Sequence, residues 1–197
     1  YCCGSMFLGC TSLTQTPELP ATTLAEGCYS SMFEGCTSLT TASSILPATT
    51  LAKYCYISMF SGCTSLTQTP ELPATTLTYG CYSSMFQGCT DLTTAPELPA
   101  TTLASYCYDI MFQGCTGLTT APELPATTLE ESCYSSMFSG CSNLNYIKCL
   151  ATNRKGINCI KFWVNEVAST GTFVKAADTY WPTGTSGIPE GWTVIEE

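Results

Sequence analysis

Cysteine is the residue of this sequence that could carry chemistry, because it recurs as a pair eight positions apart. Thiols at this density could bind a metal, form disulfides or fill a hydrophobic core. Twelve of the fifteen cysteines stand at the two repeated positions. The copies read CYSSMFEGC (28–36), CYISMFSGC (55–63), CYSSMFQGC (81–89), CYDIMFQGC (107–115) and CYSSMFSGC (133–141), with a variant, CCGSMFLGC, at 2–10.

Spacing decides among these three uses of cysteine. Zinc sites cluster their ligands, often at C-x₂₋₄-C spacing with histidine, and this chain has no histidine. If the segment between paired cysteines is helical, the pair lies about 12 Å apart, beyond the roughly 7 Å that a disulfide spans. A bridge between copies, such as Cys63–Cys89, is conceivable, although identical thiols in every copy leave its pairing ambiguous. Cysteine is often fully buried, so we favour two columns of reduced, inward-facing cysteine, without metal or cofactor.

The segments that must position these cysteines repeat about every 26 residues. The methionine of each copy is separated from the next by 26, 27, 26, 26 and 26 residues, and the extra residue falls in the stretch 43–45. A period in the twenties predicts a solenoid with one supersecondary unit per turn. The methionines are Met6, Met32, Met59, Met85, Met111 and Met137.

Within one unit, apolar residues every four positions predict a helix. In the fourth copy these are Leu77, Cys81, Met85 and Cys89, with Thr76 as N-cap, while the glycine at 88 suits a left-handed C-terminal position. The stretch 92–95 favours a short strand that ends at prolines 96 and 99. The expected fold is therefore α/β, a solenoid of about six 26-residue strand–turn–helix units with a parallel sheet on one face.

Two domains are predicted from the extent of the repeats. Residues 1–147 form the repeat solenoid, and residues 148–197 form a C-terminal capping segment, because an open terminal unit would expose its core. Trp181 and Trp192 are expected to cover the last repeat.

Charge and hydropathy exclude several classes of partner. The net charge of −9 falls entirely in residues 1–147, which hold ten acids and one base, Lys53. Such acidity argues against nucleic acid, which needs a basic surface, and no apolar run could cross a membrane. We expect no nucleic-acid binding and no membrane insertion by this fragment. The chain starts inside a repeat, so we expect its targeting segment to lie outside this sequence.

The motif Phe-x-Gly-Cys-x-Ser-Leu resembles the leucine-rich repeats of the BspA-like family of bacterial, Bacteroides-type surface proteins. Residues 7–13, 33–39 and 60–66 match this core, and 86–92, 112–118 and 138–144 match with a substitution at the serine position. The sequence departs from the family in having methionine where the family has alanine, and in a turn about three residues longer. Residues 171–175 and 187–194 resemble the ending of many such proteins. The resemblance implies a leucine-rich-repeat protein at the cell surface, bacterial or extracellular, with a role in adhesion.

Three repeated columns of residues are candidates for a binding surface. We favour the polar residues after the strand leucine, and the tyrosine after the first cysteine is the alternative. A glutamate column, Glu71, Glu97 and Glu123 with Glu18 farther away, is expected to be a solvated edge. The favoured residues are Thr14, Thr40, Thr41, Thr67, Gln68, Thr93, Thr94, Thr119 and Thr120, and the alternative ones are Tyr29, Tyr56, Tyr82, Tyr108 and Tyr134.

The sequence points away from an enzyme. Without histidine there is no Ser/His/Asp or Cys/His site, and no phosphate-binding loop occurs. We therefore expect a non-enzymatic, cell-surface or secreted module that presents a repeat face to proteins or glycans of a host or neighbouring cell. The alternative is a purely structural, rigid spacer of a larger surface protein. Regular threonine columns also raise ice binding, but alanine at 42, 95 and 121 interrupts that array.

Overall fold

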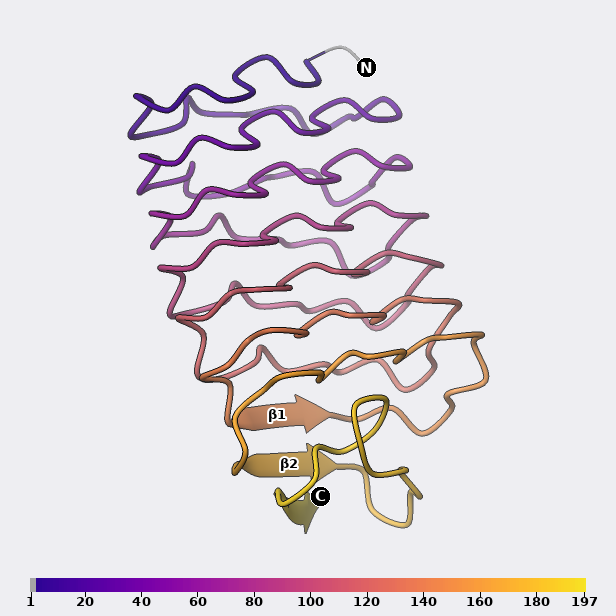
Figure 1. Cartoon of the computed structure of the whole chain (residues 1–197). Coiled ribbons are helices and arrows are strands. Elements are labelled where there is room, and N and C mark those ends of the chain that lie inside the picture. The colour runs from indigo at the N-terminus through magenta and orange to yellow at the C-terminus, as the bar shows by residue number, and fades with distance from the viewer. Residues whose placement is uncertain (1–2) are drawn as a thin grey trace.

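The computed structural model describes residues 3–197 and shows the chain wound into stacked coils, with the two ends at opposite ends of the stack (Figure 1). Residues 3–197 contain no α-helix. The strands are β1 (Tyr146–Cys149), β2 (Thr172–Lys175) and β3 (Thr193–Glu196), which form a parallel sheet in the order β1-β2-β3. The repeat cysteine at position 2 lies outside the described residues.

The predicted α/β leucine-rich-repeat solenoid of strand–turn–helix units is therefore wrong. Each predicted helix is instead a run of four-residue turns. Of the predicted strand 92–95 and its equivalents, only the last, 144–147, overlaps a strand, β1, and the others form at most isolated bridges such as Thr41↔Gln68. The family resemblance implied an adhesive role together with a leucine-rich-repeat fold, and the observed fold gives that role no support.

The backbone of each predicted helix alternates between two kinds of hydrogen bond. The Cys28 amide donates within its own coil to Ala25 O, at 3.2 Å, whereas the next amide, of Tyr29, crosses to Cys55 O in the following coil, at 2.8 Å. Every fourth residue has a positive φ, as at Ser31 (52°) and Gly35 (72°), which no α-helix tolerates repeatedly. We call these segments, residues 28–36, 55–63, 81–89, 107–115 and 133–141, the turn wall.

A four-residue turn explains why the hydrophobic pattern resembled a helix. Successive turns bury two adjacent side chains and leave the next two partly exposed, as with Cys55-Tyr56 and Met59-Phe60, which are all buried. A period of four differs little from the helical 3.6 over three turns. The glycine at 88 is left-handed as expected (φ 72°), but it belongs to a turn and not to a helix end.

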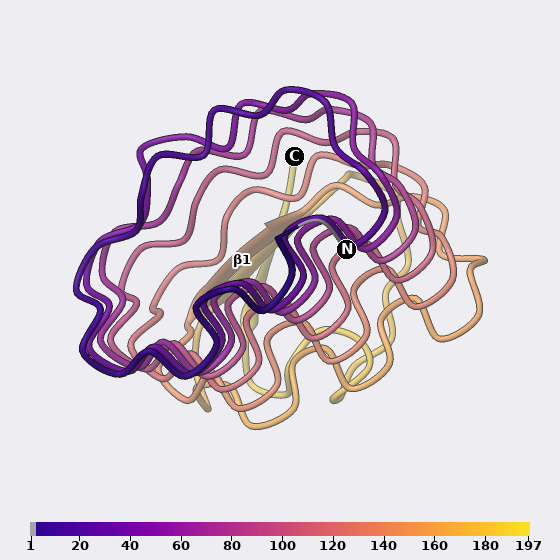
Figure 2. The same ribbon diagram turned by 90° about the horizontal axis from the view of Figure 1, so that it is seen from above.

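The opposite wall of each coil is extended, and the core lies between the two walls (Figure 2). Along this wall Leu98 and Ala100 point inward and are buried, while Glu97 and Pro99, which alternate with them, are exposed. Such alternation is the period of an extended strand. Seen down the stack, the wavy turn wall and the extended wall enclose a flattened interior.

Aromatic rings form two columns through this interior. The phenylalanines at 60, 86 and 112 stack with ring centroids 5.6 and 5.7 Å apart, and the tyrosines at 56, 82 and 108 stack at 5.6 and 5.9 Å. Each coil thus places the same ring on the one before it, so the 26-residue repeat is also the repeat of the core.

Residues of the C-terminal segment close the last coil. Trp163 is fully buried, with its ring 6.3 Å from that of Tyr134 and 6.2 Å from that of Phe138, and Trp181 stacks on its other side at 5.7 Å. Trp163 therefore covers the last rung directly, and Trp181 covers Trp163. The boundary drawn at 147/148 falls inside β1.

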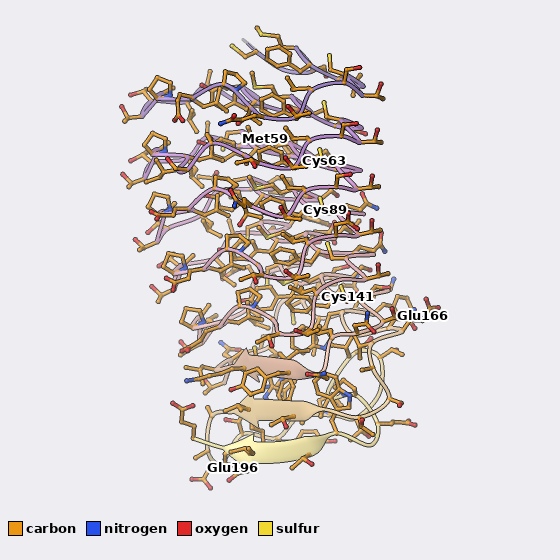
Figure 3. The ribbon with its side chains drawn as sticks, turned by 90° about the vertical axis from the view of Figure 1, so that its left-hand side faces the viewer. Met59, Cys63, Cys89, Cys141, Glu166 and Glu196 are labelled. Atoms are coloured by element: carbon orange, nitrogen blue, oxygen red, sulfur yellow. The ribbon has the colours of Figure 1, made fainter. Side chains whose placement is uncertain are left out.

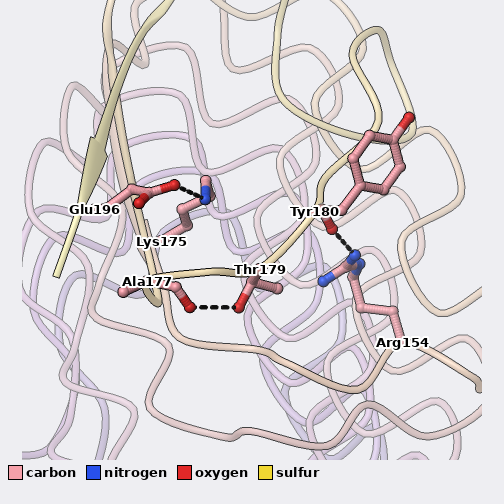
Figure 4. Close-up of polar contacts among 6 residues, drawn as sticks. All are labelled: Arg154, Lys175, Ala177, Thr179, Tyr180 and Glu196. Atoms are coloured by element: carbon pink, nitrogen blue, oxygen red, sulfur yellow. Dashed lines mark hydrogen bonds and ion pairs between the residues drawn. The ribbon is translucent and has the colours of Figure 1, made fainter.

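Polar contacts hold this C-terminal segment in place (Figure 4). Arg154 donates to the carbonyl of Tyr180 and lies 4.2 Å from the ring centre of Trp181. Lys175 on β2 forms an ion pair with Glu196 on β3. Two of the five bases in residues 148–197, Arg154 and Lys175, thus fix the cap.

Candidate functional site

The favoured binding residues form one continuous exposed surface, which we call the threonine–glutamine face. From the second coil onward each group follows a buried leucine, as Thr67 and Gln68 follow Leu66, at the corner where the turn wall meets the extended wall. Parallel bridges Gln15↔Thr41 and Thr41↔Gln68 keep the coils in register there. All nine residues are exposed except Thr41, which is half-buried; they are Thr14, Thr40, Thr41, Thr67, Gln68, Thr93, Thr94, Thr119 and Thr120.

Two hydroxyl groups on this face are oriented by hydrogen bonds to the preceding coil. Thr40 Oγ1 donates to Thr14 O at 3.1 Å, and Thr67 Oγ1 donates to Thr40 O at 3.2 Å. Because a hydroxyl has one proton and two lone pairs, these threonines retain acceptor capacity for another molecule. Thr40 and Thr67 thus offer uncharged, pre-oriented acceptors on two successive coils.

A shallow hollow lies on this face between two adjacent coils. Its volume is about 230 Å³, and its threonines are Thr93 and Thr94 from one coil and Thr119 and Thr120 from the next. Alanines 95 and 121, with Pro122, form its floor and edge. The hollow could accommodate one small polar group between two coils.

A second threonine column was missed by sequence reasoning. The repeated Ala-Thr-Thr tripeptide buries or half-buries its alanine and exposes both threonines, and bridges such as Thr76↔Thr102 join successive coils. The motif itself was the available signal, but Thr76 was assigned to a helix N-cap that does not exist. The pairs are 22–23, 49–50, 75–76, 101–102 and 127–128.

The alternative tyrosine column is not an exposed surface. All five of its residues, Tyr29, Tyr56, Tyr82, Tyr108 and Tyr134, are buried. Their rings stack along the core and end on Trp163. A partner could not reach them without opening the fold.

Burial of the repeat cysteines is confirmed from the second coil onward, and the thirteen cysteines among residues 10–159 form no disulfide. The second cysteine of each coil donates its S–H to a phenylalanine carbonyl in the preceding coil, as Cys63 Sγ does to Phe33 O at 3.1 Å and Cys89 Sγ to Phe60 O at 3.2 Å. Cys63, Cys89 and Cys141 lie in line along the stack (Figure 3).

The environment of these thiols suppresses their reactivity. Burial raises the pKa of Cys63, Cys81 and Cys141 to about 12. Since the thiolate is the nucleophile and the metal ligand, thiols of this kind are poor at both tasks near neutral pH. Within residues 3–197 no group of three or more His, Cys, Asp or Glu side chains could hold a metal ion.

Comparison with known proteins finds no matching family model, no matching curated protein and no matching solved structure. The resemblance to BspA-like repeats therefore stays a prediction from the Phe-x-Gly-Cys motif. Across the described part of the chain, no helix is long and apolar enough to cross a membrane.

Proposed function

We propose that this chain is a non-enzymatic, exported binding module whose threonine–glutamine face attaches to an extended polar partner. A glycan suits this face better than a polypeptide strand, because its many hydroxyl donors match the threonine acceptors. The observation that carries the proposal is an uncharged, exposed face repeated on five successive coils.

Repetition compensates for weak contacts at each coil. A partner that binds one coil is held close to the next, so that several weak contacts add to a useful avidity. The register of the first three coils supports this reading, because the backbone amides of Thr40 and Thr67 donate hydrogen bonds to the coil before them at 3.0 Å. We expect little dependence on salt, since no charged residue belongs to the face.

Buried cysteine is compatible with an exported protein. Outside the cell, thiols commonly form disulfides, but that reaction proceeds through an accessible thiolate. The second-column thiols are buried and hydrogen-bonded to carbonyls. We infer that they would stay reduced at a cell surface.

Changing Thr67, Thr93 and Thr119 together to lysine should abolish attachment without unfolding the chain. The three side chains are exposed, so the long charged replacements cover the face but leave the core intact. Binding is measured on an array of immobilised polysaccharides and glycoproteins. The matched control places lysine at Thr75, Thr101 and Thr127 in the second threonine column, which should leave attachment unchanged.

The second candidate function is a rigid spacer, favoured by the backbone hydrogen bonds that join every pair of successive coils along the turn wall. A spacer would bind nothing on the array, before or after the substitution. Equal loss of binding in both triple variants would locate attachment elsewhere and refute the role of this face.

A further inference from the structure

Two neighbouring grooves cross the extended wall, away from the turn wall. They lie between three consecutive Pro-Glu-Leu-Pro segments, 70–73, 96–99 and 122–125, which we call the proline–glutamate wall. The groove between the first two segments has a volume of about 450 Å³, and the groove between the last two has about 350 Å³. Prolines and glutamates from both flanking coils line each groove, and Glu97 borders both.

Proline keeps these grooves open because it has no N–H to bond with the next coil. A Pro-Glu-Leu-Pro segment does form backbone hydrogen bonds with a neighbouring coil that lacks this motif. Glu71 N donates to Ser44 O at 2.9 Å, and Leu124 N donates to Lys148 O at 3.0 Å. Among the described residues, no backbone hydrogen bond joins 70–73 to 96–99 or 96–99 to 122–125. The amide and carbonyl of Glu97 are consequently free to bond with another molecule.

The negative charge of this wall favours a cationic partner. Glu71, Glu97 and Glu123 are exposed in consecutive coils, and residues 1–147 contain a single base. One glutamate of this wall already pairs with a lysine of the same chain. The bridge Leu124↔Cys149 places Lys148 one coil beyond Glu123, and Lys148 Nζ lies 3.3 Å from Glu123 Oε2. No ion pair to Glu71 or Glu97 occurs among residues 3–197.

We propose that the proline–glutamate wall is a docking surface for a lysine-bearing, extended segment of a partner protein. The aliphatic part of each lysine lies along proline rings in a groove, as long side chains commonly do on apolar surfaces, and its ammonium group pairs with Glu71 or Glu97. The free amide and carbonyl of Glu97 bond with the partner backbone.

The repeat distances suit such a segment. The coil repeat, measured between equivalent phenylalanine rings of the core, is 5.6 to 5.7 Å, and alternate side chains of an extended peptide lie about 6.8 Å apart. Long, flexible lysine side chains at every second position therefore reach adjacent grooves. This surface adjoins the threonine–glutamine face, because Ala95 and Pro122 line both the hollow of that face and one groove. Its glutamates do not belong to that face, so the inference does not rest on the function proposed for it.

The test measures binding of a fluorescent peptide with alternating lysine and serine by anisotropy. We expect saturable binding that weakens with salt, and at least a tenfold loss in the double variant Glu71→Gln, Glu97→Gln. The matched control, Glu34→Gln with Glu130→Gln, changes net charge equally on other parts of the chain and should retain the affinity.

Chemical coupling locates the contact independently. A carbodiimide activates a carboxylate, which then forms an amide with a nearby lysine amine, and mass spectrometry should find the peptide on Glu71 or Glu97. An equal loss of affinity in both double variants, or coupling spread evenly over all exposed glutamates, would show non-specific attraction and overturn the proposal. Absence of saturable binding would overturn it as well.

Discussion

Raising the pH above about 9 is expected to unfold this protein in a steep transition. An ordinary thiol has a pKa near 9.0, and burial raises the pKa of Cys63, Cys81 and Cys149 to about 12. Burial also raises the pKa values of six further cysteines: Cys55, Cys89, Cys107, Cys115, Cys133 and Cys141.

Stability falls as the pH rises because the unfolded chain releases its thiol protons at a lower pH than the folded chain does. Between about pH 9 and 12 the unfolded chain loses thiol protons that the folded chain retains, so stability is complete below pH 9 and is lost as the pH rises. Each fully buried thiol contributes about 1.4 kcal/mol per pH unit in that window. Nine such thiols would remove a typical stability of roughly 5–15 kcal/mol within about one to two pH units.

Urea unfolding at a series of pH values measures this effect. The triple variant Cys63→Ala, Cys89→Ala, Cys115→Ala should show a shallower loss of stability with pH, although it is less stable at neutral pH because three S–H···O contacts are gone. A thiol reagent should react slowly with the native chain and with all fifteen cysteines after unfolding. Stability that stays level to about pH 11 would show that the cysteines are not buried.

Replacing Trp163 by alanine is expected to cost about 3–5 kcal/mol of unfolding free energy, as large-to-small changes of buried aromatics do. The Trp163 ring contacts the last tyrosine of its column and Trp181. Its Nε1 also donates to Gly187 O at 2.8 Å, and losing that donor adds about 1 kcal/mol or more. The cap and the last coil should loosen together.

Thermal and urea unfolding of the Trp163→Ala protein test this expectation. Trp163→Phe is the matched control, because it keeps an aromatic ring on the column and loses only the indole hydrogen bond, so its loss should be clearly smaller. If both variants are as stable as the original chain, the C-terminal segment does not close the stack.

Features that depend on the repeat period were predictable from the sequence, and features that depend on backbone conformation were not. The 26-residue period and the inward position of Cys81 and Met85 follow from where apolar residues recur. The helix was inferred from that same recurrence, and a recurrence every four residues suits turns equally well. The distinguishing signal lay in the outward pairs 30–31 and 34–35. The second residue of each pair, Ser31 or Gly35, has a positive φ.

The candidate surfaces were predictable to a similar, partial extent. Exposure of Thr67, Thr93 and Thr119 was expected because they follow an inward leucine. The grooves were not, since they result from bonds that proline fails to make with the neighbouring coil. Glu97 had been assigned only to a solvated edge because the sequence does not show what lies beside it in space.

Far-ultraviolet circular dichroism of the native protein tests the central structural claim most directly. Residues 28–36 and their equivalents are either helices or four-residue turns, and the two possibilities differ strongly in their backbone spectrum. A stack of turns with short parallel strands predicts a spectrum without the paired minima of α-helix. A strong helical spectrum in the native protein at neutral pH would contradict the turn wall, the burial of the tyrosine column and the surfaces derived from them.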